Sequence, residues 1–185
     1  MIGVVLAGGA SLRFGGEPKA LKLLQGVPLA VHVAQVLAGV CDRVFLEDNG
    51  DEVYGALGLA RLKTSREHAG KGPLAGMAAG LAAADGRRVA FAPCDLPLLA
   101  PSIYRALAMH ANGAYAVSPS GVEPLVCVLP DTALMRVNEA LGLPTVPRVI
   151  HLMEQIGANA VRFDDSRAFF NVNTPEDLAS LNAGS

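Results

Sequence analysis

A short apolar strand that runs directly into a glycine-rich, basic loop constrains this chain more than any other feature. The segment 2–6 contains no polar side chain, and the loop after it holds two glycine pairs, a hydroxyl group and two basic residues. Glycines let backbone N–H groups approach an anion without a Cβ in the way. This pattern predicts a phosphate-binding loop at the carboxyl end of the first strand of an α/β domain. The loop reads Leu6-Ala7-Gly8-Gly9-Ala10-Ser11-Leu12-Arg13-Phe14-Gly15-Gly16, and Lys19 follows after two intervening residues.

Two common phosphate-binding motifs are absent from this loop. A P-loop needs the spacing G-x-x-x-x-G-K-[ST], and a dinucleotide fingerprint needs the spacing G-x-G-x-x-G. Neither spacing occurs here, and the loop is longer and more basic than a dinucleotide turn. From the residues alone, a glycine-rich connection with two ordinary surface cations remains the alternative.

The remaining pattern predicts an α/β fold: a three-layer, Rossmann-like arrangement with a mostly parallel central sheet. Predicted strands alternate with predicted helices, so helices are expected to cover both faces of the sheet. Ligands on such sheets bind beyond the carboxyl ends of the strands, where the loops 7–19 and 93–97 are expected to lie. The predicted strands are 2–6, 43–47, 59–62, 88–92, 114–118, 124–129 and 160–163, and the predicted helices are 28–38, 73–84, 101–111, 131–141, 147–156 and one that starts at Pro175 after a Thr174 cap.

Composition narrows the function classes. With 185 residues, we expect one domain, 1–185. The apolar fraction of 51% fits strands buried on both faces, and the net charge of −2 argues against a nucleic-acid surface or a polybasic membrane patch. No stretch reaches transmembrane length and no signal peptide is visible, so a cytoplasmic protein is expected.

Cysteine and histidine residues show no metal-ligand spacing. Three widely separated cysteines argue against a disulfide framework and against structural zinc, and we interpret them as buried thiols. The histidines are interpreted as structural or surface residues. These residues are Cys41, Cys94 and Cys127, and His32, His68, His110 and His151.

The predicted helix 73–84 contains Gly76 and Gly80, four apart on one face. Glycine inside a helix costs about 1 kcal/mol relative to alanine, so a close approach must compensate for it. Either the sheet or a ligand could make that approach.

The order of four motifs resembles the molybdenum cofactor guanylyltransferase family (molybdopterin-guanine dinucleotide biosynthesis protein A) within the nucleotidyltransferase superfamily. The similarity spans the whole chain, and the four motifs together are more specific than any one of them. They are Leu-Ala-Gly-Gly-x-Ser-x-Arg-Phe-Gly-x-x-x-Lys at 6–19, Gly-Pro-Leu-Ala-Gly-Met at 72–77, Pro-Cys-Asp-Leu-Pro at 93–97 and Phe-Asn-Val-Asn-Thr-Pro-Glu-Asp-Leu at 170–178.

This resemblance implies a Mg²⁺-dependent enzyme that transfers GMP from GTP to molybdopterin and releases pyrophosphate. The expected partners are these two substrates, with transient contact to proteins of molybdenum cofactor biosynthesis or to acceptor proteins, and neither nucleic acid nor membrane. Two alternatives stay open: a cytidylyltransferase or another nucleotidyltransferase that acts on molybdopterin or another phosphorylated metabolite, and a nucleotide-binding paralogue without activity.

Asp95 is the candidate metal ligand, because a carboxylate directly after an apolar strand offers the hard oxygen that Mg²⁺ prefers. Its alternative role is to cap a following helix. The family implies the metal role, with Asn171 or Asn173 joining it. Lys19 and Arg13 are expected to contact the phosphates. The predicted catalytic residues are Arg13, Lys19 and Asp95; the nucleotide-binding residues are Leu6, Ala7, Gly8, Gly9, Ser11, Arg13, Lys19, Pro73, Leu74, Gly76 and Asp95; and the metal ligands are Asp95, Asn171 and Asn173.

Two positions depart from the family pattern. The family usually has an asparagine at the end of its second strand and an aspartate soon after its third, and this chain has Glu47 and Thr64 there. The neighbouring Asp48, Asn49 or Ser65 could substitute for them if the loops shift by one residue. These positions help to hold the nucleoside, so the sequence leaves the choice of base open.

Overall fold

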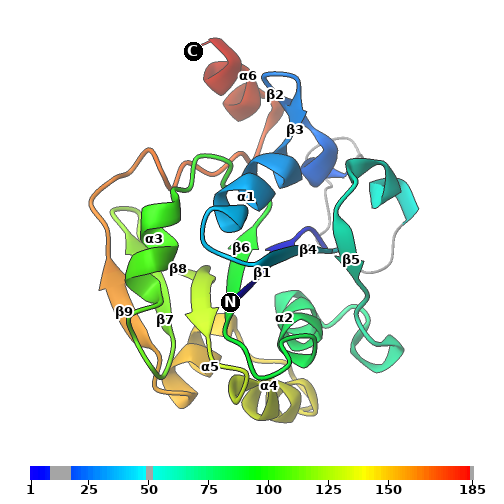
Figure 1. Cartoon of the computed structure of the whole chain (residues 1–185), viewed down its shortest axis with the longest axis vertical. Coiled ribbons are helices and arrows are strands. Elements are labelled where there is room, and N and C mark those ends of the chain that lie inside the picture. Colours follow the sequence, from blue (N-terminus) through cyan, green and yellow to red (C-terminus); the bar gives the residue numbers. More distant parts are fainter. Residues whose placement is uncertain (9–17, 49–51, 184–185) are drawn as a thin grey trace.

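A twisted sheet of seven strands forms the centre of the computed structural model, which describes residues 1–8, 18–48 and 52–183 (Figure 1). The strand order is β5-β4-β1-β6-β8-β7-β9. Every neighbouring pair is parallel except the two pairs that β8 makes. The predicted α/β class with a mostly parallel sheet is therefore confirmed. The strands are β1 (Ile2–Leu6), β4 (Arg43–Glu47), β5 (Ala60–Leu62), β6 (Val89–Pro93), β7 (Ala114–Ser118), β8 (Gly121–Leu129) and β9 (Asn159–Arg162).

Helices cover both faces of this sheet, which gives three layers (Figure 1). Helices α1 (Leu29–Ala38) and α3 (Pro101–Leu107) pack on one face, where Val5 of β1 is buried. Helices α2 (Pro73–Ala82), α4 (Ala133–Leu141) and α5 (Val149–Gln155) pack on the other, where Val4 of β1 is buried. Neighbouring side chains of β1 therefore enter opposite cores, as the two-residue period of a strand requires.

Close packing of α2 on the sheet explains its glycines. A Cβ added at Gly80 would stand 2.7 Å from Cε1 of Phe91, and one at Gly76 would stand 2.5 Å from Oε2 of Glu47. These contacts support the first of the two explanations for the glycines, which is close packing of the helix on the sheet.

The predicted helix 101–111 is shorter in the structure. Helix α3 ends at Leu107, and the chain continues in tighter turns, in which His110 N–H donates to the Leu107 carbonyl at 3.3 Å. Likewise Pro28 does not lie inside α1, which begins at the next residue, Leu29. The described residues also form three short 3₁₀ helices, which are η2 (Lys19–Leu21), η3 (Glu52–Leu57) and η4 (Arg66–His68).

A small hairpin and the last helix form an addition beside the main sheet, at the top of Figure 1. Strands β2 (Leu23–Leu24) and β3 (Val27–Pro28) flank a tight turn, in which Gln25 and Gly26 have φ of 51° and 78°. Helix α6 (Pro175–Ala183) packs on this hairpin, and Asn182 Oδ1 accepts a hydrogen bond from Gln25 N–H at 2.8 Å. The sequence analysis did not predict this hairpin, whose positive φ at both turn residues is typical of a two-residue hairpin turn.

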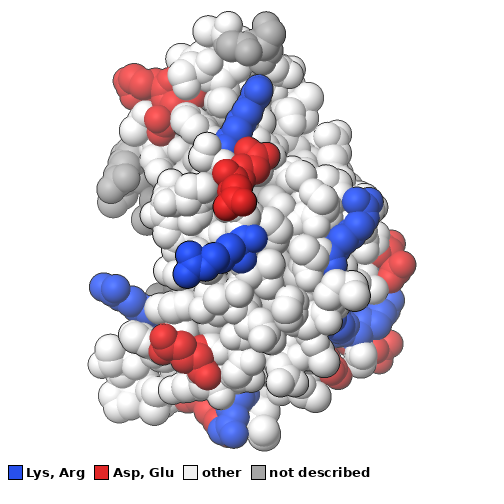
Figure 2. All heavy atoms as spheres, turned by 90° about the vertical axis from the view of Figure 1, so that its left-hand side faces the viewer, with Lys and Arg blue, Asp and Glu red and all other residues white. Residues whose placement is uncertain are grey.

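The distribution of surface charge and the lengths of the helices can be compared with those expected of nucleic-acid-binding and membrane-spanning proteins. On the face that carries β9, acidic and basic side chains are interspersed and do not gather by sign (Figure 2). Within the described ranges, no helix has both the length and the apolar character needed to cross a bilayer.

Candidate functional site

The first loop and the Asp95 loop leave the sheet side by side. In the ladder between β1 and β6, Leu6 is paired with Pro93, and Cys94 N–H donates to the Leu6 carbonyl at 3.1 Å. On the other side, Ala7 N–H donates to the Glu47 carbonyl at 2.8 Å. The predicted nucleotide-binding residues Leu6, Ala7 and Gly8 therefore begin at the carboxyl edge of the sheet, whereas the predicted site residues Gly9, Ser11 and Arg13 lie outside the described residues.

Lys19, Asp95 and Asn173 meet at this edge although they come from three distant parts of the chain. The Lys19 ammonium donates to Asp95 Oδ2 at 2.8 Å and to Asn173 Oδ1 at 3.0 Å. The Lys19 and Asp95 side chains are 17% and 23% exposed, so water or a ligand can reach both. Lys19 is thus within hydrogen-bond distance of two other predicted site residues, Asp95 and Asn173.

Residues 171–173 are attached to the Asp95 loop through Val172. The Val172 N–H donates to the Asp95 carbonyl at 2.9 Å, and its side chain is fully buried. Asn171 is exposed and lines a cavity that Asp95 also lines, whereas Asn173 contacts Lys19. The two asparagines therefore have different surroundings, and both remain candidate metal ligands.

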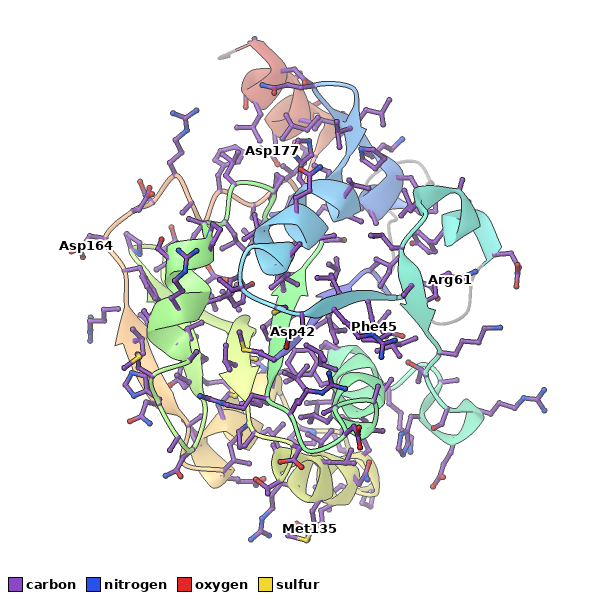
Figure 3. The ribbon with its side chains drawn as sticks, in the orientation of Figure 1. Asp42, Phe45, Arg61, Met135, Asp164 and Asp177 are labelled. Carbon is purple, nitrogen blue, oxygen red and sulfur yellow. The ribbon has the colours of Figure 1, made fainter. Side chains whose placement is uncertain are left out.

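Asp177 holds the backbone next to the proposed ligand Asn173, a positioning role that the sequence analysis did not predict. Its Oδ2 accepts 2.8 Å hydrogen bonds from the N–H groups of both Asn173 and Thr174, while the Thr174 hydroxyl accepts from Asp177 N–H at 3.2 Å. These reciprocal bonds form a capping box, which confirms the predicted Thr174 cap. The hydrogen bonds from Asn173 and Thr174 lower the pKa of Asp177. Figure 3 shows Asp177 at the start of α6. An acidic residue three positions after Thr174 was the available signal.

Glu47 and Thr64, the two residues that depart from the family pattern, contact each other. The Thr64 hydroxyl donates to Glu47 Oε1 at 2.6 Å, and Glu47 is only 3% exposed. Its Oε2 lies against Gly76 at the start of α2. Next to it, the buried Asp48 forms an ion pair of 2.5 Å with Arg61 of β5, which is labelled in Figure 3. The buried carboxylates of Glu47 and Asp48 thus lie beside the segment 73–76, which is predicted to approach the base.

A cavity of about 560 Å³ opens beside Asp95. It lies where β6 and β8 separate, because their ladder stops at the pair of Phe91 and Cys127. The predicted site residues Pro73, Leu74, Asp95 and Asn171 all line it. Its other lining residues are Lys71, Pro93, Leu96, Val122, Glu123, Pro124, Leu125, Val146, Pro147, Arg148, Val149 and Ile150.

The thiols and imidazoles take no part in this arrangement. All three cysteines are free, and burial raises the pKa of Cys41 to about 11 and that of Cys94 to about 12. His32 contacts the Leu24 carbonyl at 2.9 Å, and His151 contacts Glu154 on the exposed face of α5. In the described part of the chain, no three His, Cys, Asp or Glu side chains are grouped so as to hold a metal.

Comparison with known proteins decides the family. Residues 3–158 match the family model described as the MobA-like NTP transferase domain. The chain belongs to this family. The MobA-like chain is 36% identical over 186 residues to the molybdenum cofactor guanylyltransferase of Acidiphilium cryptum, a match that covers 98% of this chain and 93% of the relative. It is also 36% identical over 185 residues to the protein of the same name from Cereibacter sphaeroides, covering 97% and 94%.

A solved structure supports the same fold. The molybdopterin-guanine dinucleotide biosynthesis protein A of Archaeoglobus fulgidus aligns with a TM-score of 0.76 at 22% identity, covering 99% of this chain and 97% of that one. The family model and the curated relatives make the MobA-like chain an enzyme of the nucleotidyltransferase class.

Proposed function

We propose that this nucleotidyltransferase transfers GMP from GTP to molybdopterin with Mg²⁺ and releases pyrophosphate. The observation that carries the proposal is the convergence of Lys19, Asp95 and Asn173 beside the cavity. In this reaction a phosphate oxygen of the acceptor attacks the α-phosphorus, and the bond from that phosphorus to the oxygen bridging to the β-phosphate breaks. The transition state is strongly anionic, so positioning and charge stabilisation supply most of the catalysis.

The donor set fits a magnesium ion. Mg²⁺ is commonly bound by one or two carboxylates together with substrate phosphates and water. Asp95 supplies one carboxylate, whose Oδ1 has no hydrogen bond to any of the described residues, and Asn171 or Asn173 supplies an amide oxygen. When bound, the ion would neutralise charge on the α-phosphate. Lys19 would hold the neighbouring phosphate oxygens by hydrogen bonds from its ammonium.

The nucleoside is proposed to lie over Leu6, Ala7 and the start of α2. At that point the buried Glu47 carboxylate lies against Gly76 of α2. Guanine is chosen over cytosine because the curated relatives at 36% identity are named guanylyltransferases.

The acceptor is proposed to occupy the cavity beside Asp95. A cavity of about 560 Å³ is of the size that takes small-molecule ligands. Its walls are mostly apolar, and Lys71 and Arg148 bring positive charge that suits a phosphorylated acceptor. An acceptor phosphate held there would lie next to the carboxylate proposed to hold the metal.

Measuring pyrophosphate release with each of the four nucleoside triphosphates, molybdopterin and Mg²⁺ tests this function. We expect release with GTP, dependence on both Mg²⁺ and acceptor, and a guanine dinucleotide product. A preference for CTP would contradict the guanine assignment. Thermal stabilisation by GTP and Mg²⁺ without any release would instead support the paralogue that binds nucleotide without turnover.

A further inference from the structure

The cavity beside Asp95 contains a second carboxylate, that of Glu123, to which the proposed reaction assigns no role. Glu123 lies in β8 at an interruption of the ladder with β7. Ala116 is paired with Glu123, but the preceding residue Tyr115 is paired with Cys127, so residues 124–126 have no partner on β7. Pro124 cannot donate a ladder hydrogen bond, and bulges of this kind commonly redirect side chains beside functional sites.

One oxygen of the Glu123 carboxylate is held in place. The hydroxyl of Ser118, which is 6% exposed, lies 3.2 Å from both Glu123 Oε1 and the Gly121 carbonyl, so its one proton is shared between these two acceptors. The Ser118 oxygen in turn accepts from Ser120 N–H at 3.2 Å, which fixes the turn between β7 and β8. The Oε1 atom of Glu123 is therefore held by Ser118, at the turn between β7 and β8.

The other oxygen has no hydrogen-bond partner among the described residues, and no Lys, Arg or His of that part of the chain forms an ion pair with Glu123. Burial raises the pKa of Glu123, the Ser118 hydrogen bond lowers it, and the charge of Asp95 raises it. A partly buried carboxylate without a cation is costly unless something else hydrogen-bonds to it. A ligand in the cavity can supply those donors.

The rest of the cavity indicates what kind of ligand this is. Leu125, Val146 and Ile150 offer apolar walls against which a flat ring can lie. Arg148 also lines the cavity, is exposed and forms no hydrogen bond within the described residues, so it suits an anionic substituent. A complementary ligand has an apolar ring face, an edge of two N–H donors and a negative group.

We propose that the Glu123 carboxylate binds the acceptor's pterin ring through the paired donors of its 2-amino group and adjacent ring N–H. This inference rests on the proposed function, since it takes the cavity as the acceptor site. A carboxylate that accepts two parallel N–H bonds gives both geometric specificity and strong, charge-assisted hydrogen bonds. Glu123 thereby selects the acceptor and takes no part in phosphoryl transfer.

The test compares two free heterocycles, pterin and lumazine, which differ at position 2. Pterin has the amino donor there, whereas lumazine has a carbonyl oxygen that would face the carboxylate. In fluorescence titrations the wild-type protein is expected to bind pterin at least about tenfold more tightly than lumazine. The wild-type measurement is sufficient to overturn the proposal. It does so if the protein binds lumazine as tightly as pterin, or if it binds neither ring.

Glu123→Gln is the matched variant, because it keeps the shape and the oxygen that faces Ser118 but loses the charge. We expect its affinity for pterin to fall about ten- to hundredfold, and the preference over lumazine to disappear. With GTP and molybdopterin, KM for the acceptor should rise by a similar factor while kcat and KM for GTP stay near the wild-type values. The proposal is overturned if the Glu123→Gln protein still prefers pterin over lumazine, or if its kcat falls while KM for the acceptor is unchanged.

These results separate the inference from the function on which it rests. If the wild type releases pyrophosphate from GTP but Glu123→Gln behaves identically, the Glu123 assignment fails and the function stands. If no nucleotide supports release but the pterin preference exists and depends on Glu123, the assignment of the ring site stands and the transferase function fails. Arg148→Met serves as a control, because it should weaken molybdopterin binding but leave the ratio of pterin to lumazine affinity unchanged.

Discussion

Lys19 and Asp95 lie 76 positions apart in the chain, yet their side chains form an ion pair of 2.8 Å. The pair joins the end of the first loop to the loop after β6. Asn173 shares the Lys19 ammonium at 3.0 Å, so the last motif is joined to the same point. Three motifs that the sequence presents separately thus meet at one edge of the sheet.

Replacement of Asp95 by asparagine should lower kcat for pyrophosphate release by about a hundredfold or more. The amide keeps an oxygen for Lys19 but removes the negative charge that a metal and its phosphate ligand require, and the loss of one transition-state stabiliser typically has this size. Steady-state kinetics with GTP checks it. Asp164→Asn is the control, because Asp164 is exposed in the loop after β9 and points away from the molecule (Figure 3). Equal turnover in the two variants would remove Asp95 from the chemistry.

Asp177→Asn should weaken both the start of α6 and the placement of Asn173. The hydrogen bonds from Asn173 N–H and Thr174 N–H lower the pKa of Asp177 below its ordinary value of 3.8. A carboxyl group whose pKa is lower in the folded state contributes stability above its unfolded pKa and loses that contribution as the pH falls through its folded pKa. The difference in urea midpoint between wild type and variant should therefore be largest near neutral pH.

That difference should disappear below the folded pKa of Asp177, where both proteins carry an uncharged group. Glu176→Gln is the matched control, since the exposed Glu176 makes no hydrogen bond within the described ranges. A midpoint difference for Asp177→Asn that is the same at every pH would contradict the charge-based explanation. A raised KM for GTP, with Glu176→Gln unchanged, would report the displaced Asn173.

Gly80→Ala should destabilise the fold by about 0–2 kcal/mol. The added Cβ would lie 2.7 Å from Cε1 of the fully buried Phe91 and 3.0 Å from Cγ2 of Val4. Overpacking of this kind costs about 1–3 kcal/mol, from which the helix propensity of alanine recovers about 1 kcal/mol. Chemical denaturation measures the change. Gly55→Ala is the control, because Gly55 has nothing within 4 Å and should tolerate the methyl group. A stabilised Gly80→Ala would show that α2 is free to move away from the sheet.

Native alkylation should distinguish the three thiols. Burial raises the pKa of Cys41 to about 11 and that of Cys94 to about 12, and it raises that of Cys127 as well. Only thiolates react, and Cys41 is the one thiol that is partly exposed. At pH 8 iodoacetamide should modify Cys41 slowly and first, and Cys94 and Cys127 only after unfolding, as mass spectrometry of the peptides can show. Rapid native labelling of Cys94 would mean that the Asp95 loop opens.

The elements of the fold follow from local patterns. The strands Ile2–Leu6 and Arg43–Glu47 are found where hydrophobic runs and their turn residues predicted them. Helix α6 begins at Pro175, directly after the capping residue Thr174, as these two residues predicted. The hairpin after Lys19 was missed, because two strands of two residues each are too short for any period to appear.

The sequence by itself determined the succession of the main strands and helices and the residue types offered to a phosphate chain, because each of these depends on neighbours within a few positions. The resemblance to the family came from the order of four such local motifs along the chain. Only the tertiary structure decided which of them meet. Lys19 contacts Asp95 and Asn173 because the pairing of β1 with β6 and the Val172 hydrogen bond to the Asp95 loop bring distant segments to one edge. The position of Glu123 in the cavity likewise depends on where the β8 ladders stop, and long-range register of that kind has no signature in a local pattern.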